Sequence, residues 1–494
     1  MRNRVPYFLP IFEYLGALFW VFGFVMLVPL IVLFAYADGG RAEVPSWSYV
    51  APAALALLLG VLLKHRLTFK PLDARRAMLL CALAWIILSA LAALPFNIGL
   101  GTSYLDAYFE SVSGFTTTGI TMFEGLDGMP RSLLFWRALT QWVGGLGIFT
   151  FFLVVARAGG SAPTLFSAES HENLSKRPAP GLFSTLRILW SIYAAFTALT
   201  VAALALEGMS FYDALAHGLT AVSTAGFSTH DASIDYFRQA GYRHFAAIEY
   251  TLIAAMVLGG TNFFVHYRVL RGEVRALWDS FEVRLWWLLL AVCVALVALD
   301  HFVKFGLEEV GDTLRCSAFQ VAALATTTGY ATKDLSSSYF PSLAKLIFLI
   351  LMVTGGCAGS TAGGIKVLRI GVLLKTVGRQ TRRALYGHSA VTPIVVDGAS
   401  VAPEEIRRIA GLFFTWVCLL VVGSGVLALF SDLGLLEAAS GMFSALGNIG
   451  PSFIPVKAMI QLHPVAKITL ILGMLAGRLE ILPILLLFSR RAWR

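Results

Sequence analysis

Four short segments with threonine or asparagine close to glycine lie between long apolar runs of this sequence. Each ends in a four-residue motif of the kind Thr117-Thr118-Gly119-Ile120. An acidic residue stands thirteen positions before the glycine in three segments (Asp106, Asp213 and Glu437), and the third segment has Cys316 there. One such motif is weak evidence of a functional site. Four motifs in register, however, form an internal repeat and therefore predict a repeated architecture. The segments read DAYFESVSGFTTTGIT, DALAHGLTAVSTAGFS, CSAFQVAALATTTGYA and EAASGMFSALGNIGPS.

The composition of these segments favours a cation site. A helix of about twelve residues cannot span a bilayer, so it must enter and turn back, with its irregular backbone buried in protein or facing water. Its C-terminal end is the negative pole of the helix dipole and attracts a cation. Glycine reaches the positive-φ conformations that a tight turn requires, and threonine adds a hydroxyl oxygen.

Four such turns around one axis could replace the hydration shell of an ion, as in potassium-channel filters. The alternative is four ordinary re-entrant loops that only pack together. The predicted filter, which would bind K⁺, consists of Thr117, Thr118, Gly119, Thr224, Ala225, Gly226, Thr327, Thr328, Gly329, Asn448, Ile449 and Gly450.

A predicted membrane span at 343–375 is interrupted by the stretch TGGCAGSTAGGIK, residues 354–366. Five glycines in so short a stretch destabilise a helix interior, and broken helices at membrane depth line cavities or gates. The alternative is a close helix crossing through small residues. The predicted gate residues here are Gly355, Gly356, Gly359, Ser360, Thr361, Gly363, Gly364 and Lys366.

The last apolar run contains an arginine, Arg478, twelve residues before Arg490. That separation is roughly 18 Å along a helix, which places Arg478 near the middle of a hydrocarbon core about 30 Å thick. An arginine at that depth faces the protein interior or water and is by default functional. In a cation pore it would be an electrostatic barrier below the filter. The alternative is a structural ion pair, for example with Glu480 of a neighbouring subunit.

Other polar residues within apolar runs favour structural roles. We expect Asn262 and His266, four apart, to share one helix face and to form interhelical hydrogen bonds. His217 is expected to pack, and Glu282 and Arg284 to cap or orient a span. The five cysteines have no metal-ligand spacing and are expected to behave as small hydrophobic residues.

The overall composition predicts an all-α integral membrane protein. The chain has 494 residues, of which 57% are hydrophobic, and a mean hydropathy of +0.75. Apolar runs of about 20 residues recur along its length. The first of these is too long for a signal-peptide core and is taken as a membrane helix. The expected spans are 12–37, 47–64, 78–98, 133–156, 183–206, 245–270, 284–304, 343–375, 408–430 and 464–488.

The lysines and arginines cluster in alternate loops, so the positive-inside rule predicts cytoplasmic termini and a multi-pass protein of the plasma membrane. After an N-terminal pair of spans, the remaining spans form four span–pore helix–span units around a pseudo-four-fold pore. The predicted domains are the pair at 1–76 and the units at 77–160, 180–275, 280–385 (with the interrupted gating helix) and 400–494.

Six stretches together resemble the superfamily of Trk, Ktr and HKT potassium transporters, and most closely the membrane subunit of Trk systems. Ktr membrane subunits typically lack the extra N-terminal pair of spans. The resemblance covers essentially the whole chain. The stretches are SVSGFTTTGIT, FWRALTQWVGGLGI, GGTNFFVHY, ATTTGYAT, GGCAGSTAGGIKVLR and GRLEILP.

This resemblance implies K⁺ uptake across the bacterial inner membrane through a channel-like pore. It implies that Gly119 selects K⁺, because HKT members with serine there favour Na⁺. It also implies an intramembrane gating loop at 355–366, with Arg478 in the constriction. The expected partners are a second copy of the chain, membrane lipid, and a cytoplasmic TrkA-like ring of Rossmann-type regulatory subunits that bind NAD(H) or ATP/ADP.

Two features depart from the family pattern: Pro451-Ser452 follows the fourth glycine where a second glycine is common, and the second segment lacks a second threonine. A coupled secondary transporter is the second hypothesis, although its inverted repeats suit four parallel units less well. A membrane enzyme is the third, but no acid/base, nucleophile or metal set converges. We expect no covalently bound cofactor, no nucleotide loop on this chain and no nucleic-acid partner.

Overall fold

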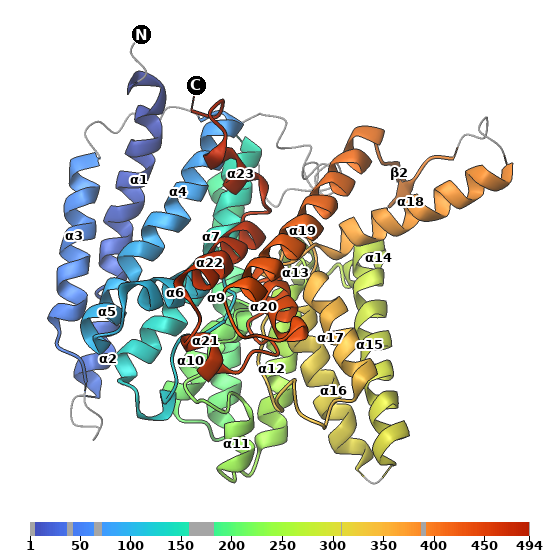
Figure 1. The fold of residues 1–494 in the computed structure, drawn as a ribbon, viewed down its shortest axis with the longest axis horizontal. Helices are drawn as coiled ribbons and strands as arrows, with labels where there is room; N and C mark the ends of the chain where they lie inside the picture. Colours follow the sequence, from blue (N-terminus) through green and yellow to red (C-terminus); the bar gives the residue numbers. More distant parts are fainter. Residues whose placement is uncertain are drawn as a thin grey trace.

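The computed structural model describes residues 5–36, 43–63, 72–157, 182–307, 309–386 and 392–493, which are almost entirely helical (Figure 1). Residues 64–71 of the basic cluster predicted at 64–76, the basic cluster at 176–177 and the predicted domain boundaries at residues 160 and 180 lie outside these residues. The helical fold class predicted from the sequence is therefore confirmed.

The N-terminal half contains α1 (Val5–Val25), α2 (Pro29–Ala35), α3 (Trp47–Leu63), α4 (Ala74–Ala92), α5 (Leu94–Leu100), α6 (Tyr104–Phe115), η1 (Leu126–Gly128), α7 (Arg131–Arg157), α9 (Leu182–Leu206), α10 (Phe211–Val222), α11 (Asp235–Gln239), α12 (Phe245–Gly260) and α13 (Phe263–Leu270). The C-terminal half contains α14 (Ala276–Asp279), α15 (Phe281–Phe305), α16 (Val310–Ala325), α17 (Ser342–Val353), α18 (Val367–Tyr386), α19 (Pro403–Leu429), α20 (Leu435–Gly447), α21 (Val456–Ile460), α22 (Pro464–Arg478) and α23 (Leu482–Phe488). Two strands of two residues each, β1 (Val395–Val396) and β2 (Ala399–Ser400), pair as an antiparallel hairpin.

Long apolar helices identify a multi-pass membrane protein. Within the described ranges, five helical segments are long and apolar enough to cross a membrane, and the bent pair α12–α13 makes a sixth. Large apolar side chains lie fully outward on them, such as Leu206 at 88% and Leu429 at 76% exposure. Such surfaces are suited to contact with lipid rather than water.

Within the described residues, fewer unbroken helices qualify as membrane spans than the ten expected from the sequence. α3 has only 17 residues, and the expected spans at 343–375 and 464–488 are each divided into two helices. The first of these divisions, between Val353 and Val367, is where the glycine-rich stretch predicted it.

The expected continuous helix at 245–270 is wrong, because α12 and α13 meet at an angle of 103°. Asn262 lies at the break and its side chain accepts a hydrogen bond from Phe264 N (2.8 Å) as the N-cap of α13. His266 bonds to Leu258 O (2.9 Å) within the same hairpin. Asn262 therefore does not share a helix face with His266, and its carboxamide stabilises the break instead.

The last expected span also breaks. α22 ends at Arg478, Glu480 and Ile481 have φ of 57° and 67°, and α23 begins at Leu482. Positive φ at two consecutive non-glycine residues is unusual and requires stabilisation by the surroundings. Arg478 therefore lies at a helix end rather than in the middle of a continuous helix.

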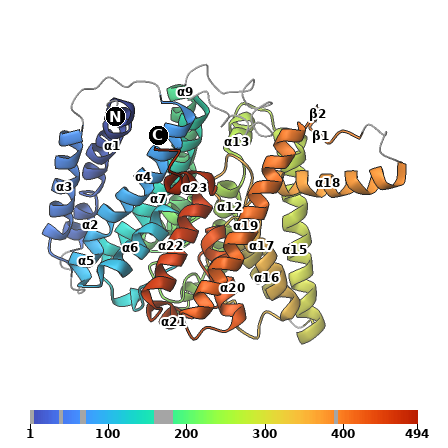
Figure 2. The same cartoon turned by 45° about the horizontal axis from the view of Figure 1, so that its top comes forward.

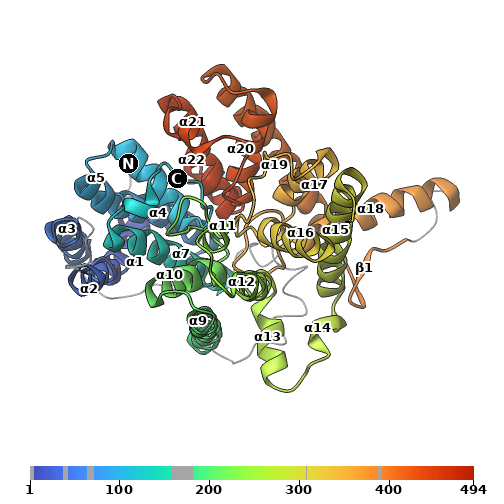
Figure 3. The ribbon, with the colours of Figure 1, turned by 90° about the horizontal axis from the view of Figure 1, so that it is seen from below.

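Four short helices, α6, α10, α16 and α20, pack between longer ones (Figure 1; α10, α16 and α20 are also labelled in Figure 3). All four have an acidic residue at the third position, namely Asp106, Asp213, Asp312 and Glu437. Because α16 is the longest of the four, its acidic residue lies four positions before Cys316, and the third segment therefore departs from the spacing of the other three. The hydroxyls of Ser103 and Ser210 at the N-caps donate to the carboxylates of Asp106 and Asp213 (both 2.7 Å) and accept from the backbone N of the same two residues (3.1 and 3.0 Å). Glu437 accepts from Gly434 N (2.8 Å). Such reciprocal caps satisfy backbone donors that a helix start leaves unpaired.

The packing of the short helices follows one cyclic order. Each contacts a helix that precedes it and a helix that follows it: α4 and α7 for α6, α9 and α12 for α10, α15 and α17 for α16, α19 and α22 for α20. Each also contacts the helix that follows another short helix: α10 on α7, α16 on α12, α20 on α17 and α6 on α22. The last contact closes a ring, so residues far apart in sequence meet at its centre.

The periphery is less compact. α1 and α3 pack on one side, next to α4, and α18 projects from the opposite side of the molecule (Figures 1 and 2). α1 begins and α23 ends at the same end of the molecule, while α11 and α21 lie at the other (Figure 1).

Candidate ion site and its gate

The four short helices end in turns that share one backbone conformation. The residue two before each motif glycine is left-handed: φ is 52° at Thr117, 52° at Thr224, 57° at Thr327 and 54° at Asn448. The motif glycines have φ of 86° (Gly119), 77° (Gly226), 82° (Gly329) and 105° (Gly450). For threonine, a β-branched residue, positive φ is a true outlier and marks a turn that its surroundings hold in place.

The hydrogen bonds of these turns explain the conformation. In the first turn Thr117 N bonds to Gly114 O (2.9 Å) and Thr118 N bonds to Ser113 O (2.9 Å). The same pair of bonds occurs in the other three turns. This is the Schellman termination of a helix, which usually places glycine at the left-handed position. Here threonine or asparagine occupies that position, and the glycine comes two residues later.

The turns form a closed ring of carbonyl groups and glycines. A Cβ atom added to Gly119 would lie 2.5 Å from Ala225 O, and one on Gly450 would lie 2.8 Å from Thr118 O. Gly226 and Gly329 are even more crowded, by Thr328 O and Ile449 O. Each glycine thus faces the carbonyl oxygen before the next motif glycine, from the first turn through the fourth and back to the first. A side chain at any of the four positions would push these oxygens apart.

The residues predicted to form the filter therefore lie together at one place. Their twelve positions come from four segments, and all the polar side chains among them are fully buried. Asn448 Nδ2 donates to Thr118 Oγ1 (2.9 Å), which ties the fourth turn to the first. A group of carbonyl oxygens at the negative poles of four helices can replace the hydration shell of a cation.

The glycine-rich loop at 354–366 lies directly against these turns. Gly363 N donates to Thr327 Oγ1 (2.7 Å), and the hydroxyl of Thr361 lies 3.1 Å from that of Thr224. A Cβ atom on Gly363 would be 2.7 Å from Asn448 Cβ. The loop thus contacts the left-handed residue of the second, third and fourth turns, on the side from which their hydroxyl or amide groups project.

The loop is also tied to the break between α12 and α13. Thr361 N and Cys357 N donate to Gly259 O (3.1 Å) and Gly260 O (2.9 Å). Glu282, at the start of α15, accepts from Ala358 N (2.6 Å), so it orients the loop rather than only its own helix. The Lys366 ammonium bonds to Ala362 O within the loop.

Arg478 joins the loop to a different part of the molecule. Its guanidinium donates to Thr361 O (2.7 Å) and to Gly144 O on α7 (3.0 Å), and the residue is 2% exposed. Within the chain, Glu480 pairs with Arg369 of α18 (2.8 Å) and not with Arg478; the predicted alternative, a pair with Glu480 of a neighbouring subunit, stays a prediction. Arg478 therefore acts on the loop through carbonyl groups.

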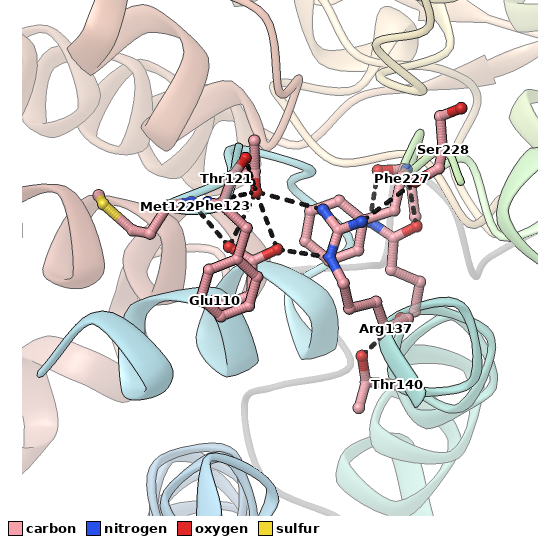
Figure 4. Close-up of polar contacts among 10 residues, drawn as sticks. Glu110, Thr121, Met122, Phe123, Arg137, Thr140, Phe227 and Ser228 are labelled. Atoms are coloured by element: carbon pink, nitrogen blue, oxygen red, sulfur yellow. Dashed lines mark hydrogen bonds and ion pairs between the residues drawn. The ribbon is translucent and has the colours of Figure 1, made fainter. Parts of the chain in front are cut away.

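A buried polar cluster behind the first turn was missed by sequence reasoning (Figure 4). Glu110 on α6 and Arg137 on α7 form an ion pair of 2.7 Å with exposures of 0% and 1%. Gln141, one helical turn after Arg137, donates to Ala225 O (2.7 Å) and accepts from Phe227 N (3.0 Å). The signal was present in the sequence, because Arg137 interrupts the apolar run at 133–156 and intramembrane arginines are rarely incidental.

His217 and four of the cysteines are buried as expected, whereas Cys418 is exposed. His217 also forms hydrogen bonds, to Asp213 O (2.8 Å) and to Ser228 Oγ (3.0 Å). It links α10 to the segment that follows the second turn.

A multi-pass helical protein with a buried ring of carbonyl groups belongs to the class of membrane transport proteins, and comparison with known proteins specifies the family. The TrkH family model, described as a cation transport protein, matches residues 49–493. The chain therefore belongs to the TrkH family, which is a family of cation transporters and not of enzymes.

Individual relatives agree with this assignment over their full length. The Trk system potassium uptake protein TrkH of Salmonella typhimurium is 32% identical over 99% of this chain and 100% of its own. TrkH of Escherichia coli is 31% identical over the same shares. The crystal structure of the potassium transporter TrkH from Vibrio parahaemolyticus matches with a TM-score of 0.85 and 29% identity, covering 100% of both chains.

Proposed function

We propose that this protein takes up K⁺ across the plasma membrane through a pore along the axis of the four turns. The observation that carries the proposal is the closed ring in which each motif glycine faces the carbonyl before the next. The names of the relatives, which describe potassium uptake and potassium transport, support K⁺ as the substrate.

In this proposal the twelve residues at 117–119, 224–226, 327–329 and 448–450 are the selectivity filter. The helices α6, α10, α16 and α20 are pore helices, each between two spans, in four units at 77–160, 180–275, 280–385 and 400–494. The N-terminal pair of spans lies within 1–76. The cyclic packing of the short helices supports this arrangement.

The gate is the loop at 355–366 together with Arg478. The loop lies against three of the four turns, and Arg478 holds it to α7. The conformation described here is accordingly a closed one, and opening requires the Thr361–Arg478 and Gly363–Thr327 bonds to break.

The proposal includes the partners that the Trk resemblance implies. Two copies of the chain associate in the membrane, and a cytoplasmic TrkA-like ring of Rossmann-type subunits controls the gate in response to NAD(H) or ATP/ADP. Both termini are cytoplasmic, which agrees with α1 beginning and α23 ending at one end of the molecule (Figure 1).

The test is cation flux into proteoliposomes that contain the purified chain, comparing K⁺, Rb⁺, Na⁺ and Li⁺. We expect wild type to pass K⁺ and Rb⁺ and to exclude Na⁺ and Li⁺. In Gly119→Ser the new side chain would displace Ala225 O, only 2.5 Å from the added Cβ. We expect this variant to admit Na⁺, with a fall in the K⁺/Na⁺ ratio on the order of tenfold.

A wild type without K⁺ preference, or a Gly119→Ser variant with unchanged selectivity, would contradict the filter. Strict stoichiometric coupling of K⁺ to H⁺ or Na⁺ flux would instead favour the secondary transporter.

A further inference from the structure

The segment that follows each motif glycine is tied to its own short helix by a side chain. Three of these side chains stand nine positions before the glycine: Glu110, His217 and Gln320. They bond to Met122 N (2.8 Å), Ser228 Oγ (3.0 Å) and Tyr330 O (3.4 Å). In the fourth case Ser440 Oγ accepts from Phe453 N (3.0 Å). Each turn is therefore fixed from behind, on the side away from the ring.

The first of these ties is the only one of the four that is charged. Glu110 accepts from Thr121 Oγ1 (3.0 Å) and Met122 N, and it pairs with Arg137 Nε (2.7 Å). Both charged groups are almost completely buried. Taking two charges out of water costs desolvation free energy, so a buried ion pair adds little net stability to a fold. We therefore look for a role of this pair in its position behind the turn.

Arg137 also reaches the second turn. Its Nη1 donates to Ser228 O (3.1 Å), and the guanidinium lies over the ring of Phe227 at 4.1 Å from the ring centroid (Figure 4). Arg137 of α7 therefore contacts both turns: it reaches the first turn through Glu110 and the second through residues 227–228.

Gln141 completes the contact with the second turn. Its amide nitrogen donates to Ala225 O (2.7 Å) and its amide oxygen accepts from Phe227 N (3.0 Å). Ala225 O is the same carbonyl that faces Gly119 in the ring. One oxygen of the ring is therefore held by a side-chain donor from outside.

We propose that Glu110, Arg137 and Gln141 are positioning residues for ion selection, which together hold the first and second turns at a fixed separation. This inference rests on the proposed filter. Na⁺ is smaller than K⁺, so its coordination requires ring oxygens to move inward. The Gln141 donor opposes this movement of Ala225 O, and the ion pair keeps α7, from which Gln141 projects, in register with both turns.

The decisive variants are at Gln141, because its side chain is neutral and its loss leaves no buried charge unpaired. Gln141→Met keeps the approximate volume and removes both hydrogen bonds. Gln141→Leu removes both hydrogen bonds as well, with a branched apolar side chain that cannot carry a charge. We expect both to lower the K⁺/Na⁺ uptake ratio of the full-length protein in proteoliposomes about tenfold, the change equivalent to one hydrogen bond. K⁺ uptake itself should remain.

A matched control is Glu249→Gln. Glu249 is 2% exposed and pairs with Arg315 (2.6 Å), so it is an equally buried carboxylate, but it bonds to an arginine of α16 rather than to a turn. We expect the K⁺/Na⁺ ratio of this variant to equal that of wild type. Glu110→Gln and Arg137→Lys should lower the ratio like the Gln141 variants, provided that each elutes as a monodisperse species in detergent.

The outcomes separate the two proposals. If wild type selects K⁺ and Gly119→Ser loses selectivity, but folded Gln141 variants keep the wild-type ratio, the positioning role is wrong and the filter stands. If wild type shows no K⁺ preference, the filter itself is wrong. Equal loss of selectivity in Glu249→Gln would also overturn the positioning role, because any buried carboxylate would then have the same effect.

Discussion

Two buried arginines illustrate how residue type alone does not decide function. Arg137 has a carboxylate partner, Glu110, at 2.7 Å. Arg478 donates instead to two carbonyl oxygens, of Thr361 and Gly144, and its Nε has no hydrogen-bond partner among the described residues. A guanidinium satisfied only by carbonyls is held less strongly than one paired with a charge. Arg478 is therefore suited to release the loop, and Arg137 is suited to stay in place.

We predict that Arg478→Gln increases Rb⁺ uptake into proteoliposomes that lack any regulatory partner. The variant loses charge-assisted bonds to Thr361 O and Gly144 O, each worth roughly 1.5–3 kcal/mol. In the proposed gate the closed conformation is the one that has these bonds, so its population should fall by at least about tenfold relative to the open one.

The Rb⁺ uptake of Arg478→Lys should lie between those of wild type and Arg478→Gln. A lysine ammonium keeps the positive charge but lacks the forked guanidinium that reaches two carbonyls. Uptake at or below the wild-type rate in Arg478→Gln would show that Arg478 does not hold a closed gate.

At the scale of elements, the sequence is sufficient to predict those helix starts and breaks that are caused by neighbouring residues in the chain. The short helices begin at Ser103 and Ser210 because these residues cap them, and 354–366 breaks a helix because glycine is abundant there. The 103° bend at Thr261 had no comparable signal. The carbonyls of Gly259 and Gly260, which the end of α12 leaves without a partner in the helix, accept hydrogen bonds from the loop about 100 residues later, and no local pattern can indicate this.

The same limit applies to the turns themselves. The sequence predicted positive φ at the motif glycines, and this is confirmed at Gly119 and its counterparts. It did not predict positive φ at Thr117, because threonine disfavours that region. The conformation follows from the Schellman bonds to Ser113 O and Gly114 O and from burial among the other turns.

A prediction at this scale concerns the contact between the loop and the fourth turn. Alanine at Gly363 would bring its Cβ to 2.7 Å from both Asn448 Cβ and Gly447 O. Because real Cβ atoms do not approach so closely, the loop must shift away from the turn. We expect Gly363→Ala to raise Rb⁺ uptake several-fold, since even about 1 kcal/mol against the closed loop changes its population about fivefold.

The matched control for this change is Gly378→Ala in α18, where an added Cβ meets nothing within 4 Å. That variant should leave uptake unchanged and stabilise the helix by about 0.5–1 kcal/mol. Equal uptake in both variants would mean that the loop does not obstruct ion movement.

At the scale of the whole molecule, contacts between distant segments close the structure into a ring. Asn448 bonds to Thr118, Lys467 pairs with Asp106, and Arg478 bonds to Gly144. The sequence repeat predicted which segments are equivalent, but not these contacts, because a comparison of segments carries no information on which of them touch in space. The ring therefore depends on individual side chains as well as on the repeated pattern.

Another contact between distant segments includes a histidine. His230 bonds through Nδ1 to Asp127 in η1, lies 3.5 Å through Nε2 from Asp213 at the start of α10, and stacks on Tyr236 at 3.4 Å between ring centroids. Burial lowers the pKa of His230, but the hydrogen bonds and charges of Asp213 and Asp127 outweigh this effect, so the pKa is raised above its ordinary value of 6.5. The imidazole thus joins the loop after the first turn to the second short helix.

We predict that this contact makes the thermal stability of the protein fall as pH rises above neutrality. A raised pKa in the folded state gives stabilisation that is complete below about pH 6.5 and is lost as pH rises through the raised value. The apparent Tm in detergent should fall on the order of 2 °C across this step in wild type, and the step should be absent in His230→Gln. His301→Gln, which removes a ring bonded to the Tyr339 carbonyl, should keep the step. An identical pH profile in His230→Gln and wild type would mean that the two aspartates do not hold a protonated imidazole, and that the first and second units are joined mainly by the contacts of α7.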